Sequence, residues 1–286
     1  MKVLLTGGRG MLGRTLAAEW RGFSVIQTDL PEADITDPAG FEKILEKYQP
    51  DAVVHCAAMT AVDRCESEVE LAYQLNAWGT KNVAWACHKL GIRLIAISTD
   101  YVFDGNAKRP YNEFDLPNGG ICVYGKSKFA GEIAIRVHCP NHVICRISWL
   151  YGQGGSNFVD TMIKLADGTR PTLKVVKDQI GNPTSTLSVA HKLEEILRHP
   201  EWVGTFHLTC EGEATWYEFA QEIFKQLHIN QKVVPCTTDE FPRVARRPAN
   251  SRLDNMMLRL AGSAPMPDWK DALHAFLDNR YGVSET

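Results

Sequence analysis

Tyr124 and Lys128 are the two residues whose types and spacing point most directly to chemistry. They lie four residues apart in the segment YGKSK, and the helix formers of 129–136 that follow predict a helix, which would place both side chains on one face. An ammonium beside a phenol favours the tyrosinate and lowers the phenol pKa from its usual value of about 10. Such a tyrosine could exchange a proton with a sugar or alcohol oxygen while hydride moves to or from a nicotinamide. Because this pair also occurs by chance, the elements that position it decide its meaning.

A glycine-rich turn near the N-terminus would supply the nucleotide. Residues 2–6 predict a short apolar strand, Gly7, Gly10 and Gly13 follow at once, and 14–20 continue with helical spacing. In a dinucleotide site the first glycine allows the tight turn, the second lets the backbone approach the pyrophosphate, and the third allows close helix–strand packing. The phosphates would then bind the amides at the helix N-terminus. The spacing G-x-x-G-x-x-G is a variant typical of short-chain dehydrogenase-like proteins.

Two residues give opposite indications about which dinucleotide binds. The predicted strand 24–28 ends in Asp29, about 20 residues past the loop, where an acidic side chain can hydrogen-bond the adenosine ribose and favours NAD. Arg9, inside the loop, could instead attract a 2′-phosphate, and a solvated charge is an equal alternative. NADH and NADPH therefore both stay open. Asp34 and Ile35 follow as an acidic–apolar pair that can border the adenine.

Two further predicted strands end in residues suited to a ligand crevice. Strand 52–56 runs into a segment where backbone could pass close to a cofactor, made of Ala57, Ala58, Met59 and Thr60. The apolar strand 92–98 runs into Thr99, Asp100 and Tyr101, and hydroxyls at the carboxyl end of a central strand project into the crevice of open α/β sheets. No helix is expected to begin at Thr99, which argues against a capping role. The polar loop 106–122 is expected to be a mobile flap.

The order of elements predicts an α/β fold built on a Rossmann-like, doubly wound parallel sheet. Strands and helices alternate to about residue 150, with a long and mostly helical stretch over 66–90, so 1–150 is assigned as the NAD(P)-binding domain. Beyond it the alternation weakens, and 151–286 is expected to be mainly a smaller α+β substrate-binding lobe. Segments near 182–208 are expected to return to the first domain.

Composition excludes several classes of protein. The 286 residues carry a formal charge of -3, so no basic field favours nucleic acid. No signal peptide or membrane-spanning apolar run is recognised. The eight cysteines are scattered without a C-x-x-C pair, which indicates free thiols in a reducing compartment and no metal site. We therefore expect a cytoplasmic protein without a membrane partner.

At this point the chain resembles the extended short-chain dehydrogenase/reductase superfamily and, more narrowly, the dTDP-4-dehydrorhamnose reductase family. The glycine loop and Tyr-x-x-x-Lys carry only the broader resemblance. The narrower one rests on segments that span nearly the whole chain, namely TGGRGMLG at 6–13, STDYVFDG at 98–105, SWLYG at 148–152, DQIGNPT at 178–184 and RRPANSRL at 246–253.

The resemblance implies NADPH- or NADH-dependent reduction of the C4 keto group of a dTDP-4-dehydro-6-deoxyhexose to dTDP-L-rhamnose. Tyr124 would be the acid, Lys128 would hold the nicotinamide ribose, and Thr99 would orient the same oxygen. The sugar contacts would fall on Thr99, Asp100, Tyr101 and Trp149, with Arg252 as a further candidate. The cofactor would be lined by Gly7, Gly10, Met11, Leu12, Gly13, Asp29, Asp34, Ile35, Ala57, Ala58, Met59, Thr60, Tyr124 and Lys128.

One departure from the family bears on assembly. Some members dimerise around magnesium through a glutamate just after the last loop glycine, whereas Arg14 and Thr15 stand here. We therefore predict no metal site, and a homodimer stays possible without one. Arg246 and Arg247 could meet the substrate diphosphate or belong to a solvated basic loop. Trp216 is expected to pack within the smaller lobe.

Several other activities share the Tyr/Lys pair. A dehydratase needs an Asp-Glu pair after the threonine, whereas Asp100 is followed by Tyr101, which argues against dehydration. An epimerase stays open, although the narrow motifs favour net reduction. A reductase of another dTDP-4-keto-6-deoxyhexose is the nearest alternative enzyme. A non-catalytic NADP-binding regulatory subunit is the alternative outside enzymes, and the presence of Thr99, Tyr124, Lys128 and Trp149 together counts against it.

Overall fold

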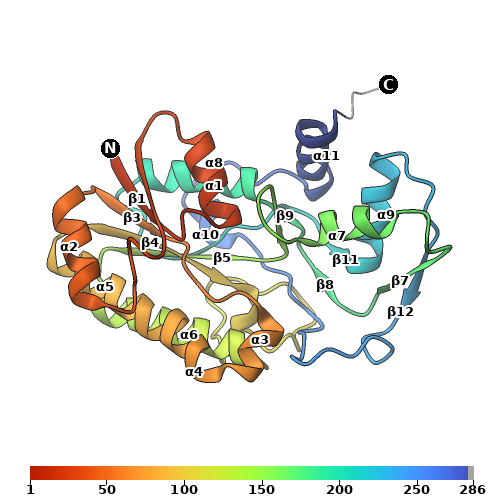
Figure 1. Cartoon of the computed structure of the whole chain (residues 1–286), viewed down its shortest axis with the longest axis horizontal. Coiled ribbons are helices and arrows are strands. Elements are labelled where there is room, and N and C mark those ends of the chain that lie inside the picture. The colour runs from red at the N-terminus through yellow and green to blue at the C-terminus, as the bar shows by residue number, and fades with distance from the viewer. Residues whose placement is uncertain (283–286) are drawn as a thin grey trace.

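A six-stranded parallel sheet lies at the centre of the computed structural model, which describes residues 1–282 (Figure 1). The strand order is β10-β5-β4-β3-β1-β2, so the doubly wound parallel sheet is confirmed. The order reverses between β1 and β3, and ligands of such sheets bind at the carboxyl ends of the strands near this reversal. The strands are β1 (Lys2–Thr6), β2 (Ser24–Thr28), β3 (Ala52–His55), β4 (Arg93–Thr99), β5 (His142–Ile147) and β10 (Gly204–His207).

Helices cover both faces of the sheet because its strands are apolar on both sides. Val3 and Leu5 pack in one core with α1 and α8, whereas Leu4 between them packs in a second core with α2, α5 and α6. Figure 1 shows α1 and α8 above the sheet and α2, α5 and α6 below it. These helices are α1 (Met11–Glu19), α2 (Pro38–Tyr48), α5 (Thr80–Lys89), α6 (Val123–His138) and α8 (Thr186–Arg198).

The stretch over 66–90, expected to be mostly helical, is a series of shorter helical elements. Its π-helical part places the fully buried Asn76 beside α6, and a side chain at Gly131 would collide with the Asn76 carbonyl. Glycine therefore allows these two helices to approach closely, and π-helical turns are frequent at functional sites. The elements are α3 (Val62–Ser67), α4 (Val69–Tyr73), η1 (Gln74–Gly79) and α5.

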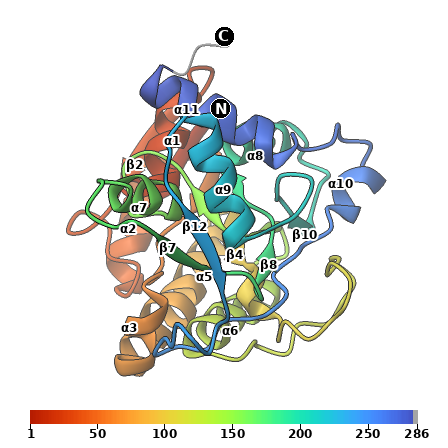
Figure 2. The same ribbon diagram turned by 90° about the vertical axis from the view of Figure 1, so that its right-hand side faces the viewer.

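The smaller lobe has its own core, in which aromatic residues such as Tyr151, Phe219 and Trp269 are buried. Figure 2 shows α9 lying against β7 and β12. β12 and α10 were not predicted from the sequence, nor were the two-residue strands β8 and β9 in and beside the polar segment 178–184. The elements outside the central sheet are η2 (Asp100–Val102), β6 (Leu150–Tyr151), α7 (Phe158–Leu165), β7 (Leu173–Val176), β8 (Ile180–Gly181), β9 (Thr184–Ser185), β11 (Ala214–Thr215), α9 (Trp216–Gln226), β12 (Val233–Cys236), α10 (Met256–Leu260) and α11 (Trp269–Tyr281).

Later parts of the chain contribute to the core on the α1 and α8 face of the central sheet. Leu193 of α8, Phe206 of β10 and Leu258 of α10 all pack in the same core as Val3 and Leu5. β10 also pairs with β5 in parallel and extends the sheet at that edge. Within residues 1–282, no helix has both the length and the apolar character needed to cross a membrane.

A buried ion pair fastens α6 to the sheet. Glu132 accepts hydrogen bonds from Arg146 at 2.9 and 2.7 Å and from the Ser98 hydroxyl at 2.6 Å. Both charged side chains are 1% exposed. Burial alone would raise the pKa of Glu132, but Arg146 and the neighbouring donors bring that pKa to about 2. The carboxylate therefore stays ionised inside the protein.

Replacing Glu132 with Gln should cost about 3–5 kcal/mol of unfolding free energy, because it leaves the Arg146 guanidinium buried without a counter-charge. Arg136 bonds the same carboxylate at 3.0 Å from a position that is 37% exposed, so Arg136→Met should cost less than about 1 kcal/mol. Urea unfolding measures both variants. Equal losses in the two would contradict the special weight given to the buried pair.

Candidate active site

Tyr124 and Lys128 lie on consecutive turns of α6, at the carboxyl end of β4. The Lys128 ammonium is buried and donates to the Ile97 carbonyl at 2.8 Å. Tyr124 is partly buried, and its ring meets the ring of Tyr101 edge to face, with the centroids 5.5 Å apart. A side chain at Gly125 would collide with the Tyr101 carbonyl. This glycine therefore lets the first turn of α6 pack against the segment that follows β4.

The prediction that Lys128 lowers the pKa of Tyr124 is wrong in this structure. Burial raises the pKa of Tyr124, and the hydrogen bond with Thr99 only partly opposes this effect. The ammonium is directed at Ile97 instead, and burial lowers the pKa of Lys128 to about 8 although the Glu132 carboxylate opposes the shift. At neutral pH the phenol is therefore protonated and the ammonium is charged.

Thr99 both caps a helical turn and contacts Asp100 and Tyr124, two arrangements that were expected to be alternatives. Its hydroxyl caps the 3₁₀ turn η2, accepting from the Tyr101 amide at 3.2 Å, so the expectation that no helix begins there is wrong. The same hydroxyl bonds the Asp100 carboxylate at 2.8 Å and the Tyr124 phenol. Asp100 is buried, and that burial raises its pKa to about 6. Thr99, Asp100 and Tyr124 thus form one polar cluster.

The glycine loop has the geometry that a dinucleotide requires. Gly7 has φ +64°, and a side chain there would collide with Ala57, while one at Gly13 would collide with the backbone of Gly7 and Gly8. Gly10 precedes α1, whose N-terminus has no side-chain cap and no acidic residue in its first turn. Its amides can therefore receive a pyrophosphate. Met11 is half-buried, and Leu12 belongs to the core between α1, α8 and the sheet.

The residues expected to contact the adenosine differ in their exposure and in their hydrogen bonds. The Asp29 carboxylate accepts from the Arg9 and Leu30 amides at 3.0 and 2.9 Å, so it closes the turn after β2. Asp34 is exposed and accepts from Thr36. The Ile35 side chain is buried in the core against Gly79. The side chains of Asp29 and Asp34 are accessible to a cofactor, whereas the buried side chain of Ile35 exposes little surface that a cofactor could contact.

Asn76 is a site residue that the sequence analysis missed. Its side chain accepts from the Met59 amide at 2.8 Å and donates to the Met59 carbonyl at 3.1 Å and to Ser127 on α6 at 3.0 Å. It therefore fixes the segment 57–60, in which Ala57 and Ala58 are half-buried and Thr60 is exposed, relative to the helix that carries Tyr124. An asparagine within a mostly apolar helical stretch was the signal that could have found it.

Trp149 is held in a strained conformation. Its φ of +47° lies in the left-handed region, which is unfavourable for a bulky residue and concentrates at functional sites. Its ring stacks on Trp216 with centroids 3.5 Å apart and planes at 7°. Trp216 packs in the smaller lobe, as expected, but it also covers one face of the predicted sugar platform. A sugar would have to use the remaining surface of Trp149.

The three candidate arginines differ in their surroundings. Arg252 donates to Glu213, to Asn250 and to the Lys108 carbonyl, each at 2.8 Å, so its guanidinium is engaged within the protein. Arg246 is exposed. Arg247 lies 6.0 Å from the Tyr101 ring centroid and pairs with Asp63 at 3.1 Å. Among residues 1–282 nothing accepts from its buried Nη1, which makes Arg247 the arginine with donor capacity to spare beside the polar cluster.

The fold and this cluster define a member of the extended short-chain dehydrogenase/reductase class. The model of the RmlD substrate binding domain family matches residues 1–281. The chain is 40% identical over 281 residues to the spore coat polysaccharide biosynthesis protein SpsK of Bacillus subtilis, with 98% of each chain covered.

Solved structures agree with this. A dTDP-4-dehydrorhamnose reductase of Clostridium acetobutylicum has a TM-score of 0.94 at 45% identity, covering 98% of this chain and 99% of the other. The dTDP-4-dehydrorhamnose reductase of Bacillus anthracis, solved in complex with NADP, has a TM-score of 0.94 at 38% identity, covering 97% and 99%. The chain therefore belongs to the dTDP-4-dehydrorhamnose reductase family.

The buried charge of Lys128 should appear in the pH dependence of stability. The pKa of Lys128 falls from 10.5 to about 8 on folding, so between these pH values the unfolded chain binds more protons and stability rises with pH. Relative to Lys128→Met, the wild type should gain about 3 kcal/mol from pH 8 to 10.5. Urea unfolding of both proteins across this range measures the difference. Parallel pH profiles would contradict a buried ammonium.

Proposed function

We propose that this protein reduces the C4 keto group of dTDP-4-dehydro-6-deoxy-L-mannose (dTDP-4-dehydro-L-rhamnose) with NADPH or NADH, giving dTDP-L-rhamnose. The observation that carries the proposal is the Thr99–Tyr124 hydroxyl pair beside Lys128, at the carboxyl end of β4. It lies in a fold whose glycine loop can receive a dinucleotide. The family to which the chain belongs is named for this reaction.

The chemistry needs one hydride at C4 and one proton at the C4 oxygen, which together turn the ketone into a secondary alcohol. The bound dinucleotide supplies the hydride. Tyr124 gives the proton, and the raised pKa keeps the phenol in the form that can donate. Thr99 bonds the same oxygen and orients it. The Lys128 ammonium, which donates to the Ile97 carbonyl, would hold the nicotinamide ribose when the dinucleotide is bound.

The substrate would extend from this cluster towards the smaller lobe. Asp100 and Tyr101 border the sugar, and the strained Trp149 presents its free surface to the hexose. Arg247, with its unused Nη1, is better placed than the exposed Arg246 to meet the diphosphate, because a partly desolvated guanidinium binds phosphate more strongly. Arg252 would first have to leave Glu213, so we assign it to holding the 106–122 loop.

The protein is proposed to work in the cytoplasm, since all eight cysteines are free thiols and most of them are buried. Dehydration is disfavoured because Tyr101, where a dehydratase needs a glutamate, packs its ring on Tyr124. A reductase of another dTDP-4-keto-6-deoxyhexose would use the same cluster. A regulatory subunit would bind dinucleotide without turnover.

Tyr124→Phe should lower the rate of NADPH oxidation with in situ generated dTDP-4-dehydro-L-rhamnose by about 10²–10⁴-fold, because the proton donor is lost. NADPH binding should be retained, since only one hydroxyl is removed. Tyr151→Phe is the matched control, because it removes a buried hydroxyl in the smaller lobe core. No turnover by the wild type would exclude the reductase, whereas full activity of Tyr124→Phe would exclude only the assigned acid.

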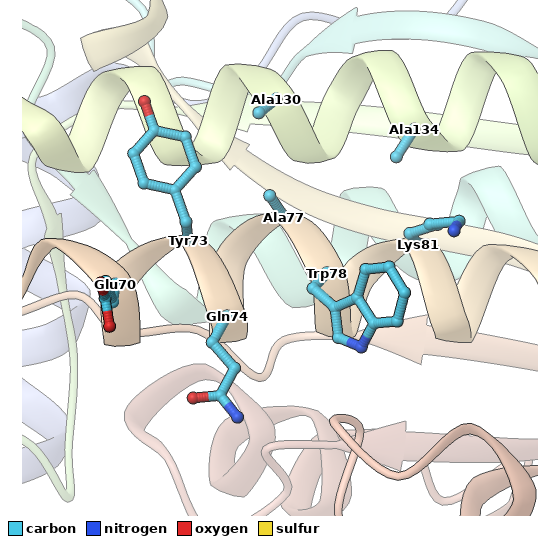
Figure 3. Close-up of a pocket in the computed structure, with 8 residues that line it drawn as sticks. All are labelled: Glu70, Tyr73, Gln74, Ala77, Trp78, Lys81, Ala130 and Ala134. Carbon is cyan, nitrogen blue, oxygen red and sulfur yellow. The ribbon is translucent and has the colours of Figure 1, made fainter.

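We further propose that the chain forms a homodimer through an apolar groove between η1 and α6. Figure 3 shows Ala77, Ala130 and Ala134 lining the groove, with Glu70 and Lys81 at its opposite ends. Large apolar side chains are exposed around it, namely Tyr73, Trp78, Trp85, Ile133 and Val137. A twofold axis through the middle of the groove would place Glu70 of one copy beside Lys81 of the other, so the surface is self-complementary.

Lys81→Glu should weaken this dimer, because two glutamates would then face each other at each end of the groove. Adding Glu70→Lys should restore association by exchanging the charges. Sedimentation equilibrium of the wild type, the single variant and the double variant measures the effect. A monomeric wild type, or a single variant that associates normally, would contradict this interface and would leave the reductase proposal intact.

A further inference from the structure

An exposed ion pair lies at the edge of the nucleotide loop. Arg9 follows Gly8 in that loop, and its guanidinium donates to the Glu32 carboxylate at 2.8 Å and to the Leu30 carbonyl at 3.1 Å. The two side chains are 61% and 55% exposed. The pair therefore closes over the turn that follows β2, outside the core and accessible to a ligand.

The base of Arg9 is fixed, whereas its end is free to move. Its backbone amide donates to Asp29 at 3.0 Å, and the other oxygen of this carboxylate accepts from the Leu30 amide at 2.9 Å. The Asp29 carbonyl also accepts from the Ala33 amide at 2.9 Å. Three hydrogen bonds donated by backbone amides thus hold the turn, while only solvent-exposed contacts hold the guanidinium.

The end of β2 is the place where the adenosine ribose is recognised in sheets of this kind, and an arginine nearby accommodates a 2′-phosphate. Asp29 is suited to the ribose hydroxyls of NADH. Arg9 is suited to the added phosphate of NADPH, because a guanidinium binds phosphate through paired charge-assisted hydrogen bonds. Glu32 already accepts from Nη2 of Arg9, a donor that the phosphate would use.

We propose that Glu32 tunes the cofactor preference of this protein by competing with the 2′-phosphate for Arg9. NADPH must exchange the Glu32 contact for its phosphate, whereas NADH leaves the Arg9–Glu32 pair in place. The inference rests on the proposed dinucleotide site but is independent of which sugar is reduced. Glu32 lies outside both the glycine loop and β2.

The strength of the competition follows from exposure. The hydrogen bonds of Glu32 with its own backbone amide and with Arg9 lower the pKa of its carboxyl, so the competitor is ionised at neutral pH. An ion pair this exposed contributes little, and we expect at most about a fivefold change in affinity. Glu32 therefore tunes the preference and leaves both cofactors usable.

Glu32→Gln should tighten NADP⁺ binding by about threefold to fivefold and leave NAD⁺ binding unchanged. Titration calorimetry on the whole protein with each oxidised cofactor, without sugar, measures this separately from turnover. Arg9→Gln should weaken NADP⁺ binding selectively, and in that background Glu32→Gln should have no further effect. The NADP⁺ gain should shrink as salt rises, since exposed charges are screened.

Glu68→Gln is the matched control, because it breaks another exposed arginine–glutamate pair, at 2.7 Å from Arg64. It should leave both affinities unchanged. Equal tightening of NAD⁺ and NADP⁺ by Glu32→Gln would overturn the proposal. So would a persistent NADP⁺ gain in the Arg9→Gln background, since Glu32 would then repel the phosphate directly instead of acting through Arg9.

Discussion

The attachment of α6 to the end of β4 is the interaction on which the rest of the site depends. Three successive turns of this helix each contact the strand end: Glu132 bonds Ser98, Lys128 bonds Ile97, and Tyr124 bonds Thr99. The first two contacts are buried and charge-assisted, so they tolerate little displacement. The relative position of the Thr99 and Tyr124 hydroxyls therefore depends on the contacts of Glu132 and Lys128. A small rotation of α6 would separate these hydroxyls before it disturbed the core.

Buried charge is distributed unevenly along this helix. The Glu132 carboxylate has a guanidinium as its partner, whereas the Lys128 ammonium has only a carbonyl within hydrogen-bonding distance and a carboxylate one turn away. The first charge is compensated by the protein itself. The second is held at a cost, which a dinucleotide ribose bonded to the ammonium would partly offset. An unfavourable free energy of this kind is common where a side chain is positioned to bind a ligand.

Much of the architecture could be predicted because it follows from local patterns. Apolar runs such as 92–98 and the spacing of Gly7, Gly10 and Gly13 fix strand, turn and helix without reference to distant residues. The short pairings β6–β9 and β8–β11 were missed because they join segments far apart in the sequence. β12 was missed because its Pro235 is untypical of a strand.

The predicted site residues came from sequence motifs, but their burial, stacking and hydrogen-bond partners could not be predicted in this way. The side chain of Asn76 reaches Met59 from a π-helical turn, and the sequence does not predict where such a turn forms. The pKa of Tyr124 was predicted in the wrong direction because burial depends on how the ring of Tyr101 packs on it. The stacking of Trp149 on Trp216 joins two segments far apart in the sequence and had no signal in either.

The repeated return of the chain to the first core has a consequence for how the protein can be divided. After β5 the chain enters the smaller lobe, comes back with α8 and β10, leaves again for α9 and β12, and comes back once more with Leu258 and Met266. The two lobes are separate cores but not separable modules. A truncation after β5 would remove an edge strand and a covering helix from the nucleotide half, and the substrate lobe cannot be exchanged between relatives as one continuous cassette.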